Sequence, residues 1–188
     1  VALAFVLLIG SGLMFRTFLN IQRVNMGFDP RGLLTFQLLG NIGNTPQERD
    51  TFKRQLREQL NAIPGVKSVT ASAPLPLAGG FSPVRWGGAE AENDPSKFLA
   101  ADLQIVLPGY FEAMGTTLLA GRTFTQEDSS PDRNLLIVDT TLAAKAFPNE
   151  SAVGKRILFR VRTPEAQWGE IIGVVAHQRN TSLVEPGR

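Results

Sequence analysis

The glycine-lysine pair at Gly154 and Lys155 is the first place in this 188-residue sequence where residue types and spacing suggest chemistry. Such a pair ends the loop that cradles nucleotide phosphates. That loop needs a glycine five residues before Gly154, where Asn149 stands, and a hydroxyl residue after the lysine, where Arg156 stands. ATP binding by this segment is therefore excluded.

His177 is the only histidine, and the chain has no cysteine. A zinc site needs several nitrogen or sulfur ligands, so we interpret His177 as a surface or strand-end residue. The Gly10-Ser11-Gly12 triplet lies inside an apolar run, where small residues favour close helix packing over nucleophilic catalysis. No Gly-x-Ser-x-Gly motif occurs elsewhere in the sequence.

An acidic cluster of Glu127, Asp128 and Asp132 is the remaining candidate for a binding site. Asp128 and Asp132 match the first and fifth positions of a calcium loop. The sixth position should be glycine and is Arg133, and the twelfth should be glutamate and is Asp139. We expect a solvated turn, with a weak cation site as the alternative. The glycosylation-like triplets at residues 149–151 and 180–182 are interpreted as exposed turns, and we predict no catalytic, cofactor-binding or metal-binding residue.

The composition is that of a folded domain, with 43% hydrophobic and 19% charged residues. The net charge is only +2, and basic residues alternate with acidic ones, so no nucleic-acid partner is expected. The lack of cysteine excludes disulfides and thiolate metal sites.

Residues 1–15 form an uncharged apolar run. As a helix the run would be roughly 22 Å long, against a hydrocarbon core of about 30 Å. We interpret it as the end of a transmembrane helix whose beginning lies outside this sequence; a signal-peptide core or a buried helix are the alternatives. Arg16 and Arg23 follow it, but they leave the sidedness open because the other flank is not in the sequence.

A strand, helix, strand unit is predicted for residues 33–71. Residues 33–39 are expected to form a buried strand and residues 66–71 a second one. Between them a helix is predicted to begin at Pro46, because Thr45 before it and Glu48 three residues later form a capping-box pattern. Pro64 ends this helix. The helix should lay an apolar stripe on one face of the sheet. The stripe consists of Phe52, Leu56, Leu60 and Ile63.

The Pro- and Gly-rich segment 74–95 contains a short possible strand at 83–86 and is the expected subdomain boundary. Asp139 is expected to cap a helix over 140–147, and residues 156–161 alternate as a half-exposed strand does. Further strands are predicted at 98–106, 116–119, 135–138 and 170–176, with a short helix at 108–114.

Six segments, in this order, resemble the periplasmic core domain of MacB-type ABC transporter permeases, the FtsX-like superfamily. They are VALAFVLLIGSGLMFRTF with FDPRGLLTFQL, LNAIPGVKSVTASAPLPL, LPGYFEAMGTTLLAGRTFTQED, LLIVDTTLAAKAFPNESAVGKRI and GEIIGVVAHQR. The sequence departs from the family at Asp139 and Thr140, where an Asn-Glu pair is common, and at residues 151–155, where the family has Asp-Pro-Ile-Gly-Lys.

The resemblance implies an α+β fold with a porter-like βαβ part and an inserted, sabre-like α+β part. On that template residues 1–27 are the end of the first transmembrane helix and its stalk. Residues 28–95 begin the porter-like part and residues 96–188 form the sabre-like part. The sequence would then stop before the porter return and the later membrane helices.

The resemblance also implies a non-catalytic permease segment that couples ATPase-driven helix movement to the periplasmic side. Its implied partners are an ABC ATPase subunit or domain, a second permease copy, a periplasmic adaptor or substrate, and the lipid bilayer. Residues after about 20 would lie on the periplasmic side of a bacterial inner membrane. A membrane-anchored sensor or solute-binding ectodomain is the alternative. An anchored hydrolase is the weakest hypothesis, since the sequence shows no nucleophile and base for it.

Overall fold

The computed structural model describes residues 2–22, 26–38, 40, 43–77, 82–129, 133–161 and 165–179. The helices are α1 (Ala2–Gln22), α2 (Pro46–Asn61), α3 (Glu90–Asn93), α4 (Tyr110–Ala113) and α5 (Thr140–Ala146), with 3-10 turns η1 (Pro95–Lys97) and η2 (Gln126–Ser129). The strands are β1 (Ser72–Ala73), β2 (Ser82–Gly87), β3 (Leu99–Leu103), β4 (Ile105–Val106), β5 (Leu118–Gly121), β6 (Leu135–Asp139), β7 (Arg156–Arg160) and β8 (Gln167–Val175).

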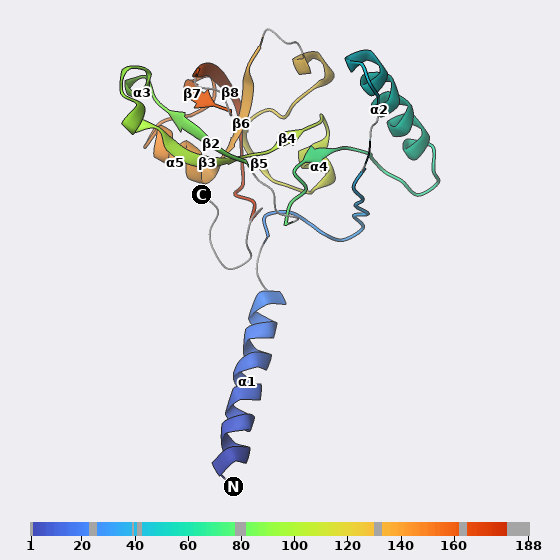
Figure 1. Cartoon of the computed structure of the whole chain (residues 1–188), viewed down its shortest axis with the longest axis vertical. Helices are drawn as coiled ribbons and strands as arrows, with labels where there is room; N and C mark the ends of the chain where they lie inside the picture. The colour runs from blue at the N-terminus through green and yellow to red at the C-terminus, as the bar shows by residue number, and fades with distance from the viewer. Residues whose placement is uncertain are drawn as a thin grey trace.

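A six-stranded sheet organises the domain (Figure 1). Its strands run in the order β3-β2-β7-β8-β5, and β6 also pairs with β8. The β6–β8 pairing is parallel, and the other pairings in this sheet are antiparallel. The nine-residue β8 therefore pairs with three other strands of this sheet.

The main core lies between this sheet and α5. Val84, Trp86, Ile157 and Ile171 are buried in it, and Ile171 is fully enclosed. Helix α5 begins where predicted, because the Asp139 carboxylate accepts a hydrogen bond from the Leu142 amide at 2.8 Å. The inward face predicted for α5 is confirmed. Its members that pack on the core are Leu142, Ala143 and Ala146.

Strand β7 corrects one prediction. Alternating exposure was expected, but the neighbouring residues Ile157 and Leu158 are both buried. They belong to different clusters: Ile157 faces the main core, and Leu158 packs with Ala91 and Phe98. The sheet is covered on both faces at this point, so both sides of the strand lose their contact with solvent.

The remaining elements after residue 98 agree with the prediction in type and place. The single strand predicted at 98–106 is divided into β3 and β4, which belong to different sheets, while α4 lies within 108–114 and β5, β6 and β8 overlap the other three predicted strands. The α+β class is confirmed.

Helix α2 forms as its capping pattern predicts, but it is not packed as expected. Both halves of the capping box are present between Thr45 and Glu48. None of its residues is buried, and Ile63, just beyond its end, is 50% exposed. Figure 1 shows α2 standing to one side of the six-stranded sheet. The prediction that its stripe lies on a sheet face is therefore wrong.

The strands predicted on either side of α2 are also wrong. Residues 33–38 form no strand, and Leu34 is 91% exposed; Leu39 lies outside the described residues. Residues 66–71 form no strand either, and the short β1 that follows pairs antiparallel with β4. An apolar run becomes a strand only where a neighbour accepts its backbone hydrogen bonds, and no described strand does so for 33–38.

Helix α1 projects from the domain, with its N-terminal end far from the sheet (Figure 1). Its apolar side chains are open to the surroundings; Leu8 and Met14, for example, are 72% and 78% exposed. Among the residues that the structure describes, no helix combines the length and the apolarity that crossing a bilayer requires.

The fully enclosed position of Ile171 leads to a stability prediction. Ile171→Ala should lower the free energy of unfolding by about 2–5 kcal/mol, because it removes buried methyl groups and leaves a cavity. Urea denaturation followed by tryptophan fluorescence measures this. Ile105→Ala is the matched control, since Ile105 is 66% exposed; its effect should stay within about 0.5 kcal/mol. Equal losses for both variants would contradict the assignment of the core.

Candidate functional site

The segment after α1 contacts the domain through backbone hydrogen bonds and a close backbone approach. We call this contact the junction: residues 26–33 on one side, and residues 110–116 with 176–179 on the other. Residues 110–116 contain α4, and residues 176–179 directly follow β8. The junction thus joins segments that are about 150 positions apart in the sequence.

Backbone hydrogen bonds hold the junction. The Asp29 amide donates to the Met114 carbonyl at 2.8 Å, and the Arg179 amide donates to the Met26 carbonyl at 2.9 Å. The segment after β8 is itself fixed to the residue that precedes β5, because the Ala176 amide donates to the Thr117 carbonyl at 2.9 Å. The chain leaving α1 is therefore tied to two separate parts of the domain.

Gly27 makes the close approach at the junction possible. Its φ of +78° lies in the left-handed region that favours glycine. A Cβ atom placed there would lie 2.2 Å from the His177 carbonyl oxygen, a distance that requires the backbone to shift. Gly115 faces Asp29 in a similar way, since its Cβ would lie 3.2 Å from that of Asp29.

An apolar cluster fills the junction from inside. Phe28 and Leu33 pack against a second buried cluster that includes Tyr110, Phe111 and Met114. Burial raises the pKa of Tyr110, whose hydroxyl oxygen accepts a hydrogen bond from the Gln104 amide at 2.9 Å. The phenol therefore stays neutral and acts as a structural group.

Asp29 and Arg31 stabilise the turn that enters the junction. The Asp29 carboxylate accepts hydrogen bonds from the Arg31 backbone and guanidinium at 2.9–3.0 Å. These hydrogen bonds lower the pKa of Asp29 to about 2. The pair is exposed, so it shapes the turn locally more than it stabilises the fold.

Two side-chain pairs fix the segment after β8. His177 Nδ1 contacts Asp139 Oδ2, while the other oxygen of Asp139 caps α5. The buried Gln178 amide donates to the Thr116 hydroxyl. The interpretation of His177 as a strand-end residue is confirmed, since it follows β8 by two positions. Its carboxylate partner is a contact that the sequence did not indicate.

The acidic cluster was expected to be a solvated turn, but the Asp128 side chain is only 5% exposed and holds the turn from inside. Asp128 accepts two hydrogen bonds from the Arg122 guanidinium, at 2.5 and 2.8 Å, and another from the Thr125 amide at 2.8 Å. These contacts keep the pKa of Asp128 far below its usual range. Asp132 lies outside the described residues. Within the described ranges, no group of three potential ligands could hold a metal ion.

The Gly154-Lys155 segment also has a structural explanation. Lys155 pairs with Glu150, and its ammonium lies 4.9 Å from the centre of the Phe147 ring. Gly154 donates its amide to the Ile171 carbonyl of β8 at 2.8 Å. The lysine is thus engaged with its own domain.

A groove of about 370 Å³ runs beside the junction, between β3–β4 and β6. Its lining is mainly apolar. Its polar lining residues include Asp139, His177 and, on β3, Asp102. The described lining residues include no serine, threonine or cysteine.

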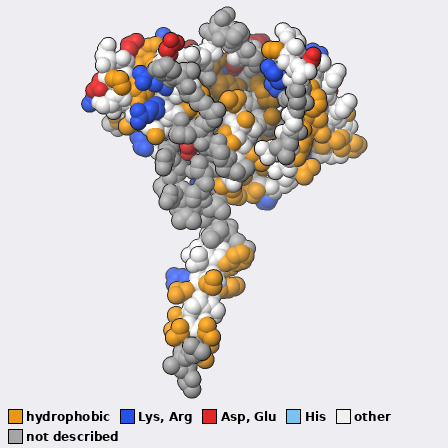
Figure 2. Space-filling view, viewed as in Figure 1, with side chains coloured by type: hydrophobic (Ala, Val, Ile, Leu, Met, Phe, Trp, Pro, Cys, Tyr) orange, Lys and Arg blue, Asp and Glu red, His pale blue; other side chains and the backbone are white. Residues whose placement is uncertain are grey.

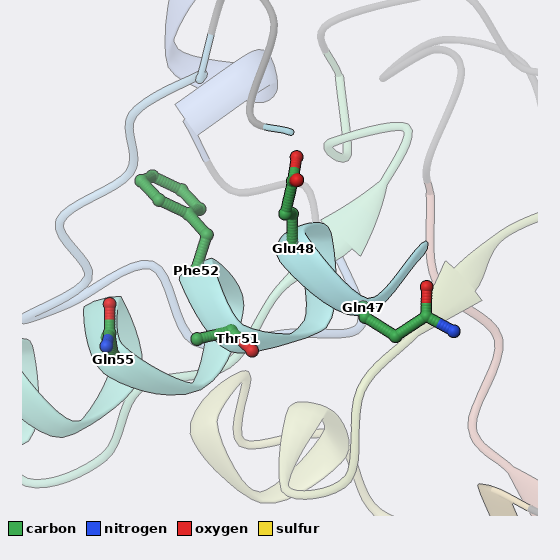
Figure 3. Close-up of a pocket in the computed structure, with 5 residues that line it drawn as sticks. All are labelled: Gln47, Glu48, Thr51, Phe52 and Gln55. Carbon is green, nitrogen blue, oxygen red and sulfur yellow. The ribbon is translucent and has the colours of Figure 1, made fainter. Parts of the chain in front are cut away.

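A second, shallow pocket lies on α2 (Figure 3). It is lined by Gln47, Glu48, Thr51, Phe52 and Gln55. All five side chains come from one helix, and the Glu48 carboxylate is already used in the capping box. Binding sites usually combine groups from several elements, so the junction and its groove are the better candidate.

The contact at Gly27 leads to a prediction about the junction. Gly27→Ala should open it, because the new Cβ strains a left-handed backbone and collides with the His177 carbonyl. Hydrogen exchange at the Arg179 amide, which bonds to Met26, should become much faster. Gly32→Ala is the control: Gly32 also has a positive φ, of +74°, but open space around it. It should cost only about 1–2 kcal/mol and leave Arg179 protected. Unchanged protection in both variants would refute the contact.

The Arg122–Asp128 pair predicts a dependence of stability on pH. A carboxyl group whose pKa is lowered by folding stabilises the folded state above its unfolded pKa of about 3.9, and this contribution is lost as the pH falls through the folded pKa. Asp128→Ala should therefore lower the free energy of unfolding at pH 7 by about 1–3 kcal/mol. The loss should shrink below pH 4. The exposed Glu127→Ala is the control, and a loss independent of pH would contradict the assignment.

The comparisons with known proteins address the whole chain. The model of the family described as "MacB-like periplasmic core domain" matches residues 1–185. The macrolide export ATP-binding/permease protein MacB of Neisseria gonorrhoeae is 33% identical over 82 residues, which are 44% of this chain and 12% of that protein. MacB of Aggregatibacter actinomycetemcomitans is 29% identical over the same lengths. The aligned part of the chain thus spans about an eighth of these relatives.

Two solved structures are similar in part. The periplasmic region of MacB from Actinobacillus actinomycetemcomitans has a TM-score of 0.49 at 22% identity, over 74% of this chain and 59% of that one. The extracellular domain of the noncanonic ABC-type transporter YknZ has a TM-score of 0.45 at 25% identity, over 64% and 55%. Because the family model matches nearly every residue, the chain belongs to the family of MacB-like periplasmic core domains.

Proposed function

We propose that this chain is the extracytoplasmic segment of the membrane-permease subunit of an ABC transporter, and that it is non-catalytic. In this proposal α1 is the end of the first transmembrane helix. Movement of α1 passes through the junction into the sheet. Family membership supports the general assignment, and the relatives are named as export ATP-binding/permease proteins.

The junction is the observation that carries the proposal. A segment that transmits force must be attached to the domain by contacts that hold it at a fixed position. Here the residues just after α1 are bonded to Met114 and to Arg179, and Gly27 lies against the backbone after β8. Since β8 pairs with β5, β6 and β7, a displacement at the junction would reach most of the sheet.

The proposal names partners and a location. ATP would be hydrolysed by a separate or fused ATPase, and a second permease copy would complete the transporter. The domain would lie on the periplasmic side of a bacterial inner membrane, facing a periplasmic adaptor or substrate. The division into a porter-like part (28–95) and a sabre-like part (96–188) stays a prediction; β2, which precedes residue 95, pairs with β3 and β7, which follow it.

A solute-binding ectodomain is the second candidate, and the groove between β3–β4 and β6 favours it. Its volume of about 370 Å³ lies at the lower end of the range typical of small-molecule sites. In that case the isolated protein would bind an apolar solute without any ATPase.

The test uses the full permease gene with its ATPase in proteoliposomes. Gly27→Ala should uncouple the system: ATP hydrolysis continues, while transport falls by about tenfold or more, because α1 no longer moves the domain. Gly32→Ala, the same substitution in open space, should keep both activities. Unimpaired transport after deletion of residues 28–188 would refute the proposal.

The membrane position of α1 can be tested separately. The sequence has no cysteine, so a single cysteine at Leu8 or Leu34 is the only labelling site in this chain. In intact cells a membrane-impermeant maleimide should react at Leu34→Cys and not at Leu8→Cys. Rapid labelling of both positions would place α1 outside the bilayer.

A further inference from the structure

Two arginines lie directly opposite each other on neighbouring strands. Arg85 of β2 and Arg160 of β7 are register partners in the antiparallel pairing. Val84 and Trp86, the neighbours of Arg85 in the strand, are buried, so Arg85 points to the outer face of the sheet. Like charges that face each other across two strands repel and destabilise the sheet.

Neither arginine is neutralised by a described part of its own chain. No carboxylate of the described residues lies within ion-pair distance of either guanidinium. Asp102 is the nearest acid by register, opposite Pro83 on β3, and it forms no ion pair with them. The contrast is clear at Arg122 and Arg31, each of which binds a carboxylate with two nitrogen atoms.

Packing holds Arg160 in place even without a counter-ion. Its guanidinium carbon lies 4.2 Å from the centre of the Phe98 ring. Its Nε atom is buried and has no hydrogen-bond partner in the described part of the chain. A guanidinium held against the face of an aromatic ring is attracted by the ring and keeps its positive charge.

We propose that Arg85 and Arg160 form a docking site for an acidic segment of a partner protein, whose carboxylates bind between the two guanidinium groups. Arginine pairs suit carboxylates because each guanidinium offers parallel N–H donors. The groove and the α2 pocket lie elsewhere, and Arg85 is exposed while Arg160 is partly covered by Phe98, so the site is a surface at the edge of the cover over Leu158, which fits an extended segment better than a small enclosed ion.

The position of the site favours a protein over a lipid. Figure 1 shows β2 and β3 beside α3, on a side of the domain that is clear of α1, and Figure 2 shows Lys and Arg side chains gathered there, with Asp and Glu side chains next to them. If α1 enters the bilayer, as the proposed function states, lipid headgroups are out of reach. This choice between protein and lipid rests on that function; the site itself does not.

Binding can be measured with the whole chain in detergent micelles. A fluorescent hexaglutamate peptide is the probe, and inorganic phosphate is the small-anion comparison. Arg85→Gln and Arg160→Gln should each weaken peptide binding by about tenfold, the loss expected for a charged hydrogen-bonded contact. Arg54→Gln, on the exposed side of α2, is the matched control and should not change it.

Arg85→Glu gives a second, opposite readout. It should raise the melting temperature of the free protein, because it replaces repulsion with an Arg160–Glu pair, and it should abolish peptide binding. This combination distinguishes the loss of a site from a loss of folding. A lower melting temperature with unchanged peptide binding would overturn the proposal.

Three other outcomes would also overturn it. They are no binding of the peptide by the unmodified chain, equally tight binding of phosphate, and capture by phosphatidylglycerol vesicles that depends on Arg85. None of these measurements involves ATP or transport. Failure here therefore leaves the permease function standing, and failure of the transport test leaves this site standing.

Discussion

The close approach of the Gly27 backbone to the segment after β8 is the constraint on which the rest of the arrangement depends. Nothing larger than a hydrogen atom fits there, since a Cβ would lie 2.2 Å from the His177 carbonyl oxygen. That contact brings Met26 within hydrogen-bond distance of Arg179 and places Phe28 on the second apolar cluster. Met26, which follows α1 after residues 23–25, is thereby bonded to the continuation of the central strand.

The central strand explains why one contact could influence so much of the domain. β8 pairs with β5, β6 and β7, and the turn around Gly154 also bonds to it. Its residues from Ile171 to Val175 are all buried, and the small Gly173 among them lies against the Arg122 backbone. A strand enclosed on both faces and both edges moves as a unit with its neighbours, because close packing leaves no free volume to absorb the displacement.

Patterns of neighbouring residues predicted much of this fold, but contacts between residues far apart in the sequence could not be predicted from it. The Thr45–Glu48 capping box and the Asp139 cap need only neighbours in the sequence, and both form. Residues 33–38 were expected to be a strand because they are apolar, yet a strand depends on a partner that no local pattern names. The junction was missed for the same reason. Its one local sign is a glycine, Gly27, and a glycine alone does not indicate which backbone it will approach.

The partners of the charged groups could not be predicted from the sequence either. Glu127 and Asp128 look alike in sequence, but Arg122 and Thr125 converge on Asp128 alone and lower its pKa. Asp139 caps α5 with one oxygen and holds His177 with the other, so a single carboxylate links the start of a helix to the junction. Arg85 and Arg160 are 75 positions apart, and only the strand register makes them opposed and unpaired. The sequence determines which residues are charged. The tertiary structure determines whether each charge stabilises the fold or remains available to a partner.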